Sequence, residues 1–219
     1  MTSVERSVYK VVETFVSING EGAKSGSLAL FIRFQGCNLH CDYCDTEWAN
    51  RDDTPYTEWT DDEIIDLVRE SKVKNVTLTG GEPLIQKDID KLIDRLITET
   101  DCRIEIETNG TISIEKWDGY YNNLSFTLDY KLPGSGVPHF VHTKNYGYLS
   151  EEDTVKFVCS NEEDLDVARE VIEKYSLSEK CNVFLSPVFG KIEPSEIVDY
   201  MMKHRMNGVR LQLQLHKFI

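Results

Sequence analysis

The sequence has no long apolar run and no excess of positive charge. No uninterrupted apolar segment approaches the ~20 residues needed to cross a membrane, and the first six residues lack the apolar core of a secretory signal. Asp and Glu total 38 against 24 Lys and Arg, a formal charge of −14, which argues against a broad basic face for nucleic acid. We therefore expect a cytoplasmic protein that binds neither membranes nor nucleic acid.

Internal repeats, low-complexity tracts and a proline-rich linker are also missing, and the prolines number only six. The chain of 219 residues is long enough for one sizeable core and too short for two comfortable domains. Its 40% hydrophobic and 28% charged residues are ordinary for a globular protein. We expect residues 1–219 to form a single domain.

The cysteines are distributed unevenly along the chain. Three of the six, Cys37, Cys41 and Cys44, fall within eight residues, and the others stand singly. Without an export signal, a reducing compartment is favoured over a disulfide framework, so the crowded three are interpreted as metal ligands. The single cysteines lie in apolar, strand-like segments and are interpreted as core residues, because buried free Cys behaves as a small hydrophobe. They are Cys102, Cys159 and Cys181.

Segments typical of strands alternate with helical patterns. Strands are expected over residues 28–34, 75–79, 102–108, 124–131, 154–159, 181–186 and 209–216, with a further strand or hairpin over 8–16. Four helices are indicated by capping boxes at Thr60–Glu63 and Ser160–Glu163, by apolar spacing over 89–97 and by Pro194. No comparable helix is indicated between Cys102 and Cys159. The pattern predicts an α/β fold with a curved, mostly parallel sheet and some crossovers reduced to loops.

Several of these strands alternate between an apolar and a polar face. Arg33, Glu105, Glu107, Asp129 and Lys131 fall on the polar faces. If helices cover the apolar faces, the polar faces look into a concave interior; the alternative is that they meet solvent. Charged groups at the carboxyl ends of strands favour a site, because βα folds place ligands there.

The segment with the strongest chemical signal is Gly36–Thr46, which contains the crowded cysteines. Three thiolates at this spacing, on a loop after a strand, can hold one 4Fe–4S cube and leave its fourth iron without a protein ligand. The alternative is a structural zinc site with His40 or a distant residue as fourth ligand. His40 adjoins Cys41 and would reach the same metal only with difficulty, and a second Cys pair is missing.

These residues resemble the radical S-adenosylmethionine (radical SAM) superfamily, whose C-x3-C-x2-C signature the cysteines match, with the typical aromatic residue at Tyr43. The sequence Gly80-Gly81-Glu82-Pro83 after a strand is a second feature of that superfamily. The resemblance implies a radical SAM fold and bound S-adenosylmethionine (SAM). The implied SAM-binding residues are Tyr43, Cys44, Asp45, Gly81, Glu82, Asp129, Tyr130, Lys131, Ser186, Pro187, Val188 and Phe189.

More narrowly, the chain resembles the 7-carboxy-7-deazaguanine synthase family. The matching segments are residues 18–22, similar to a Gln-Gly-Glu-Gly substrate loop, 31–37 before the cluster, Cys44-Asp45-Thr46, and 215–218. Asn19 stands in place of the family's Gln, and Asp129-Tyr130-Lys131 in place of Ser-Pro-Lys. The implied fold is a reduced, partial (β/α) barrel with about six core parallel strands and few strong helices.

That family acts on 6-carboxy-5,6,7,8-tetrahydropterin, and the resemblance implies the same substrate here. Its carboxylate suits the Arg33 guanidinium, and its N–H donors suit a carboxylate such as Glu107 or Glu21. Thr46 is the implied Mg²⁺ ligand. The implied substrate-binding residues are Ile18, Asn19, Gly20, Glu21, Arg33, Thr79, Glu107, His216 and Ile219, the last near the mouth of the pocket.

The implied activity is that of a lyase which forms 7-carboxy-7-deazaguanine with loss of ammonia, in 7-deazapurine and queuosine biosynthesis. The cofactor carries the chemistry, so no side chain is assigned a catalytic role. An external one-electron donor such as flavodoxin or ferredoxin and a homodimer are also implied. Two alternatives stay open: a radical-activating enzyme that acts on a partner protein, and a zinc-stabilised binding module without enzyme activity.

Overall fold

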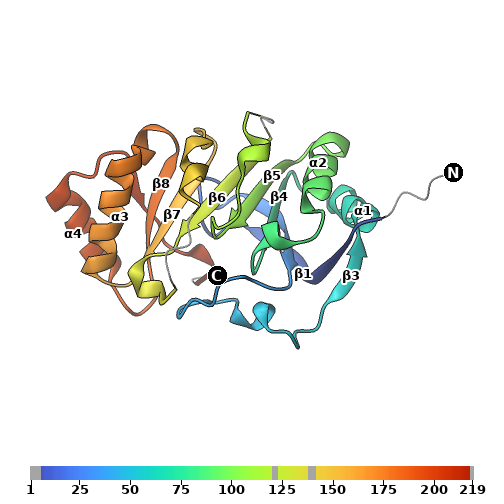
Figure 1. Ribbon diagram of the computed structural model, residues 1–219, viewed down its shortest axis with the longest axis horizontal. Helices are drawn as coiled ribbons and strands as arrows, with labels where there is room; N and C mark the ends of the chain where they lie inside the picture. The colour runs from blue at the N-terminus through green and yellow to red at the C-terminus, as the bar shows by residue number, and fades with distance from the viewer. Residues whose placement is uncertain (1–5, 120–122, 138–141, 218–219) are drawn as a thin grey trace.

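The computed structural model describes residues 6–119, 123–137 and 142–217 and contains one nine-stranded sheet (Figure 1). The strands are β1 (Val8–Ile18), β2 (Leu28–Phe34), β3 (Thr57–Thr60), β4 (Asn75–Gly80), β5 (Arg103–Thr108), β6 (Leu124–Tyr130), β7 (Thr154–Cys159), β8 (Asn182–Pro187) and β9 (Val209–Leu211). The helices are α1 (Asp61–Ser71), α2 (Ile89–Glu99), α3 (Glu162–Tyr175) and α4 (Pro194–His204). In the described part of the chain, no helix is long and apolar enough to cross a membrane.

The sheet order is β3-β1-β2-β4-β5-β6-β7-β8-β9. The strands from β2 and β4 to β9 run parallel, whereas β1 is antiparallel to β2 and to β3. The ends of this order, β3 and β9, form no ladder with each other within the described residues, so the curved sheet is an open, partial barrel (Figure 1). The predicted α/β class and the mostly parallel sheet are confirmed.

The crossovers differ in how much helix they contain. Helices α2, α3 and α4 connect β4 to β5, β7 to β8 and β8 to β9. The connections from β5 to β6 and from β6 to β7 contain only short 3-10 turns among their described residues. The prediction of crossovers reduced to loops in this region is therefore confirmed.

The two predicted capping boxes have different outcomes. At the start of α1, Thr60 Oγ1 accepts from the Glu63 N–H at 3.3 Å, and the Thr60 N–H donates to the Glu63 carboxylate at 2.7 Å. The second box is wrong, because α3 is capped by Asn161, whose Oδ1 accepts from the Asp164 N–H at 2.9 Å. Ser160 instead donates to the buried Asp164 carboxylate, which also accepts from the Gly134 N–H. Asp164 thus ties the α3 start to the loop after β6.

The hydrophobic core lies between the apolar face of the sheet and the helices. Ile32, Leu78 and Ile104 from the strands are fully buried, as are Leu92 and Leu96 from α2. Burial of each such side chain stabilises the folded state by ~1.5–3 kcal/mol. The helices therefore cover the apolar face of the sheet. The single cysteines belong to this core as predicted: Cys102 and Cys159 are buried, and Cys181 packs partly buried against it.

The last predicted strand, 209–216, is wrong in its second half because β9 ends at Leu211. From there the chain turns toward the N-terminal third of the molecule (Figure 1). The buried Gln212 side chain accepts from the Gly22 N–H at 2.9 Å and donates to the Gly22 carbonyl at 3.2 Å. The alternating pattern over 209–216 predicts that Gln212 continues the strand, but in the structure its side chain bonds to the distant residue Gly22 and the strand has already ended.

Candidate functional site

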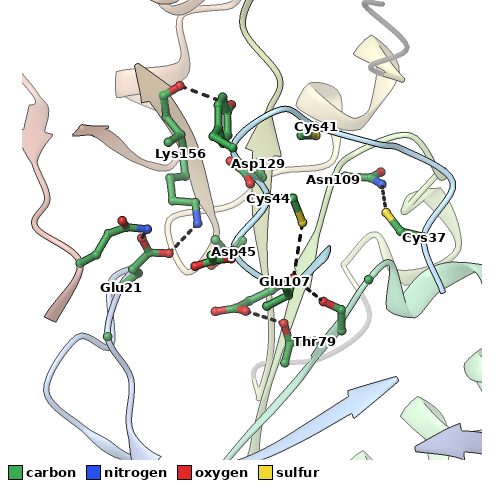
Figure 2. A pocket seen from close by; sticks show the side chains of 18 of the residues that line it. Glu21, Cys37, Cys41, Cys44, Asp45, Thr79, Glu107, Asn109, Asp129 and Lys156 are labelled. Atoms are coloured by element: carbon green, nitrogen blue, oxygen red, sulfur yellow. Dashed lines mark hydrogen bonds and ion pairs between the residues drawn. The ribbon is translucent and has the colours of Figure 1, made fainter. Parts of the chain in front are cut away.

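A cavity of about 720 Å³ lies on the polar face of the sheet, which confirms the predicted concave interior. Its described lining residues come from the strands, from the loops that follow them, including the cysteine loop after β2, and from the C-terminal segment, and none comes from α1 to α4. Figure 2 shows the three crowded cysteines and the carboxylates Glu21, Glu107 and Asp129 around this space. The volume is in the range of small-molecule sites.

The cysteine loop supplies one wall of the cavity. Cys37, Cys41 and Cys44 are all half-buried and line it. The side-chain amide nitrogen of Asn109 lies 3.7 Å from Cys37 Sγ, and that of Asn50 lies 3.7 Å from Cys44 Sγ. Both amides can donate a hydrogen bond to a thiolate. Burial raises the pKa of the Cys37 and Cys41 thiols, so a positively charged iron centre is the natural partner for their thiolate forms.

This donor set fits an iron–sulfur cube better than zinc. His40, the proposed fourth zinc ligand, is exposed and is not among the lining residues. Across the described ranges, no group of three or more His, Cys, Asp or Glu side chains converges tightly enough to hold a single metal ion. A cube has its irons at separate corners, so its three thiolates need not meet at one point.

The loop after β4 packs directly under the cysteine loop. The Gly81 N–H donates to the Phe34 carbonyl at 3.3 Å, and the Glu82 N–H donates to the Gly36 carbonyl at 2.9 Å. A Cβ on Gly81 would overlap the Gly36 carbonyl oxygen. Gly81 lines the cavity, as predicted for a SAM-binding residue, and only a residue without a side chain permits this approach.

Glu82 does not line the cavity, contrary to its predicted place in the SAM site. Its carboxylate is buried and accepts from the Asn109 N–H at 2.7 Å, the Leu84 N–H at 3.0 Å and the Thr108 hydroxyl at 2.8 Å. Burial raises its pKa even though these donors oppose the shift. Glu82 therefore stabilises the loop after β4 through these hydrogen bonds, without lining the cavity.

The other predicted SAM-binding residues divide into two groups, and the two-residue period of a strand explains the division only over residues 129–131. Those that line the cavity are Tyr43, Cys44, Asp45, Asp129, Lys131, Val188 and Phe189. Tyr130 faces the other side, with its ring 5.3 Å from that of Phe157, and neither Ser186 nor Pro187 lines the cavity. The Ser186 hydroxyl donates to the Gln212 carbonyl at 3.1 Å.

One carboxylate oxygen and one carboxamide oxygen at the cavity wall have no hydrogen-bond partner within the described residues. Asp129 pairs through Oδ2 with Lys131 Nζ at 2.5 Å, but its buried Oδ1 is unsatisfied. Asn50 Oδ1 is in the same situation. Buried acceptors of this kind call for a donor, and the amine of a bound ligand such as SAM can supply one.

The substrate residues predicted on β2, β4 and β5 meet at one place. Arg33 lines the cavity, with its Nε 2.7 Å from Glu13 Oε1. The Thr79 hydroxyl donates to Glu107 at 2.7 Å (Figure 2). Burial, strengthened by the negative charge of Glu105, raises the pKa of Glu107 to about 7 even though Lys156 opposes the shift. A carboxyl with such a pKa changes its charge in the physiological range.

The predicted substrate loop is only partly as expected. Ile18, Gly20 and Glu21 line the cavity, but Asn19 is buried away from it. The Asn19 amide donates to Glu105 at 3.0 Å and accepts from the Thr77 hydroxyl at 3.2 Å, so it anchors the loop to the sheet. The His216 side chain and Ile219 lie outside what the structure describes.

Sequence reasoning missed several residues that line the cavity. They include Asn50, Asn109, Thr127, Lys156, Gln214 and Lys217. Lys156 could have been found, because it is the only charged residue in the apolar segment 154–159 and shares a strand face with Thr154. The only local signal for Gln214 was its place on the polar side of the alternating pattern over 209–216, and the chain leaves the sheet before it.

The fold and the site together define the class of the protein. A curved, mostly parallel sheet has a three-cysteine loop after β2 and a Gly-Gly-Glu-Pro loop after β4, and both loops border one cavity. The family model described as the Radical SAM superfamily matches residues 31–129.

Comparison with curated proteins narrows the class to one family. The 7-carboxy-7-deazaguanine synthase of Clostridium acetobutylicum is 53% identical over 96% of this chain and 96% of its own. That of Methanospirillum hungatei is 35% identical over 99% of this chain and 88% of its own. The chain belongs to the 7-carboxy-7-deazaguanine synthase family. The crystal structure of QueE from Escherichia coli has the same fold, with a TM-score of 0.72, 21% identity and 94% of each chain covered.

Proposed function

We propose that this chain, acting as a single radical SAM domain, converts 6-carboxy-5,6,7,8-tetrahydropterin to 7-carboxy-7-deazaguanine with loss of ammonia, in 7-deazapurine and queuosine biosynthesis. One observation carries the proposal: the cavity has the cysteine loop on one wall and the polar residues Arg33, Thr79 and Glu107 on the neighbouring strand ends. A cofactor and a second ligand can therefore meet inside it. Family membership supports the same reaction.

The cofactor-binding part of the site is assigned to the cysteine loop and its neighbours. Cys37, Cys41 and Cys44 hold a 4Fe–4S cluster, and the backbone at Gly81 together with the unsatisfied Asp129 Oδ1 receives the amine end of SAM. A bound cluster and SAM would supply the radical chemistry that activates the substrate. The chain itself contributes orientation, charge and exclusion of water.

The substrate-binding part is assigned to the strand ends. The Arg33 guanidinium receives the pterin carboxylate, because a planar fork of N–H donors matches two carboxylate oxygens. Glu107, held by Thr79, accepts N–H donors of the pterin ring. Ile18, at the end of β1, and Gly20 and Glu21, in the loop after it, complete the pocket.

The hydroxyl of Thr46 is assigned to Mg²⁺. It lines the cavity beside the cluster loop, 3.4 Å from the Gly80 carbonyl oxygen and 3.7 Å from Cys44 Sγ. A neutral hydroxyl is a weak ligand, so oxygens of the substrate must complete the shell. The ion would then act as a template and Lewis acid for the substrate carboxylate.

We expect Thr46→Ala to lower turnover in the presence of Mg²⁺ and to leave reductive cleavage of SAM measurable. The substitution removes an oxygen ligand of the ion and leaves the three thiolates in place. Product formation and 5′-deoxyadenosine are measured in parallel at several Mg²⁺ concentrations. A variant with the wild-type rate and the wild-type Mg²⁺ response would show that Thr46 is a turn residue and does not bind the ion.

We expect pterin binding to strengthen as the pH rises through about 7. The pKa of Glu107 is raised to about 7, so the acceptor carboxylate forms only above this pH, and below it the carboxyl competes with the substrate's own donors. Glu107→Gln should weaken binding at high pH by roughly 5- to 150-fold, the equivalent of ~1–3 kcal/mol for a mispaired buried group.

Anaerobic calorimetry from pH 6 to 8 measures this dependence. The Glu107→Gln variant is its control, because an amide cannot titrate and its dissociation constant should change far less over the same range. Equal pH dependence in the two proteins would show that another group is responsible.

The decisive test of the whole proposal is anaerobic incubation with SAM, a strong reductant and the pterin, followed by mass spectrometry. We expect 7-carboxy-7-deazaguanine in excess over 5′-deoxyadenosine, because loss of ammonia from the pterin is redox-neutral and SAM is re-formed in each turnover. 5′-Deoxyadenosine without the deazaguanine would leave a radical SAM enzyme with another substrate.

In the cell, the proposed donor is a one-electron carrier such as flavodoxin or ferredoxin, and the proposed assembly is a homodimer. The proposed location is the reducing cytoplasm, which suits six free cysteines.

A further inference from the structure

Lys156 is a buried cation of the cavity to which neither the sequence nor the family comparison assigns a role. It lies on β7 opposite Asp129 of β6 in the strand register, and its side chain is 12% exposed. Its ammonium group lies 2.6 Å from Glu21 Oε2 (Figure 2). Two other cations that line the cavity, Lys131 and Arg33, pair with Asp129 and Glu13 instead.

Glu21 is held through both of its carboxylate oxygens. Lys156 contacts Oε2, and the Gln214 side-chain amide donates to Oε1 at 2.8 Å. The Leu215 N–H also donates to the Gly20 carbonyl at 3.1 Å, so the C-terminal segment fixes the backbone of the same loop. The Glu21 side chain is only 11% exposed. Its orientation is therefore determined by β7 and by the C-terminal segment, which are both distant in sequence.

Glu21 has other carboxyl groups near it besides its cationic partner Lys156, and the cation Lys131 is paired with one of them, Asp129. Asp129 of β6 and Glu107 of β5 are charged neighbours of Glu21, and Glu105 precedes Glu107 by two residues on the same face of β5. Burial alone would raise the pKa of Glu21, but the charge and hydrogen bond of Lys156, with the Gln214 hydrogen bond, hold it below its ordinary value. The pKa of Glu107 is raised instead. The pKa values of these two carboxyl groups in one cavity are thus shifted in opposite directions.

We propose that Lys156 is a positioning residue for the substrate: its ion pair holds Glu21 as a fixed anionic acceptor for the N–H donors of the pterin ring. The inference rests on the proposed function and adds a residue to it. It also assigns different states to the two carboxyl groups. Glu21 stays anionic and oriented at all working pH values, whereas Glu107 changes its charge.

The test compares Lys156→Met, Lys156→Arg, Glu21→Gln and the double variant Lys156→Met/Glu21→Gln. The KM and kcat for the pterin are measured anaerobically from pH 6 to 8, with cluster absorbance as a check of folding. Lys203→Met, at an exposed position of α4, is the matched control. If Lys156→Met fails to bind its cluster, Lys156→Gln, which keeps a donor without charge, is measured in its place.

We expect Lys156→Met to raise KM by roughly 10- to 100-fold with a smaller change in kcat, because it leaves a buried carboxylate without its charged partner. The ratio of variant to wild-type KM should grow as the pH falls from 8 to 6, since Glu21 without Lys156 takes up a proton. Arginine should recover most of the loss. In the Glu21→Gln background, Lys156→Met should add little.

Several outcomes would overturn the inference. An unchanged KM, a KM ratio that is the same at every pH, or full additivity of the two substitutions would each do so; additivity would indicate that Lys156 contacts a ligand directly. An inactive wild-type protein would contradict the proposed function and the inference together. Active wild type with an unaffected Lys156→Met variant would contradict the inference alone.

Discussion

Replacement of Cys37, Cys41 or Cys44 by alanine should abolish the cluster's charge-transfer absorbance and all turnover. A cube that is held by only three protein thiolates becomes labile when one is removed, and all three sulfurs line the same wall of the cavity. The expected effect is complete because SAM cleavage requires the reduced cluster. Anaerobic reconstitution, iron and sulfide content and 5′-deoxyadenosine formation measure it.

Two of the three remaining cysteines provide the matched controls. Cys102→Ala and Cys181→Ala remove a thiol from the core, where the sulfurs contact the carbonyl oxygens of Val73 and Leu177. They should cost stability on the order of 1 kcal/mol and leave cluster content unchanged. Loss of the cluster from one of these two variants would show that the ligands have been assigned incorrectly.

Gly81→Ala should weaken SAM binding and cluster retention together. A Cβ at this position would overlap the Gly36 carbonyl oxygen and Asn50 Oδ1, so the cysteine loop must shift away from the β4 loop. Strain of this kind typically costs ~1–3 kcal/mol. If it falls on the SAM site, the dissociation constant rises about 5- to 150-fold. Equilibrium dialysis with SAM under anaerobic conditions measures the constant.

Gly147→Ala is the control for this substitution, because a Cβ there meets nothing within 4 Å and the position does not have a positive φ. It makes the same chemical change in an open place, so SAM affinity and cluster content should stay at wild-type values. If Gly81→Ala bound SAM as tightly as Gly147→Ala, the close approach of the two loops would have no role in the site.

Much of the fold could be predicted because its elements are locally encoded. The apolar alternation of residues 28–34 and 124–131 and the Thr60 capping box depend on near neighbours in the chain. The prediction failed where a distant contact decided the outcome. Asp164, buried against the loop after β6, moved the α3 cap to Asn161, and the bonds of Gln212 to Gly22 accompany the end of β9 at Leu211.

The candidate site divides in the same way. Cysteine spacing alone indicated the candidate ligands, because three thiols within eight residues of one loop can reach a single cluster without help from distant segments. By contrast, Tyr130 and Ser186 were assigned to the SAM site by position in a motif. The strand period points Tyr130 away from the cavity, and Ser186 is buried against the Gln212 carbonyl.

The sequence by itself determined the chemical class of the protein, the alternation of strands and helices, and the polar face that became the cavity. These features depend on spacing over a few residues, where backbone geometry restricts the outcome. Only the tertiary structure decided which polar groups pair across that cavity. Glu21 meets Lys156 from 135 positions away and Gln214 from 193 positions away, and contacts over such separations follow from sheet order and closure of the core.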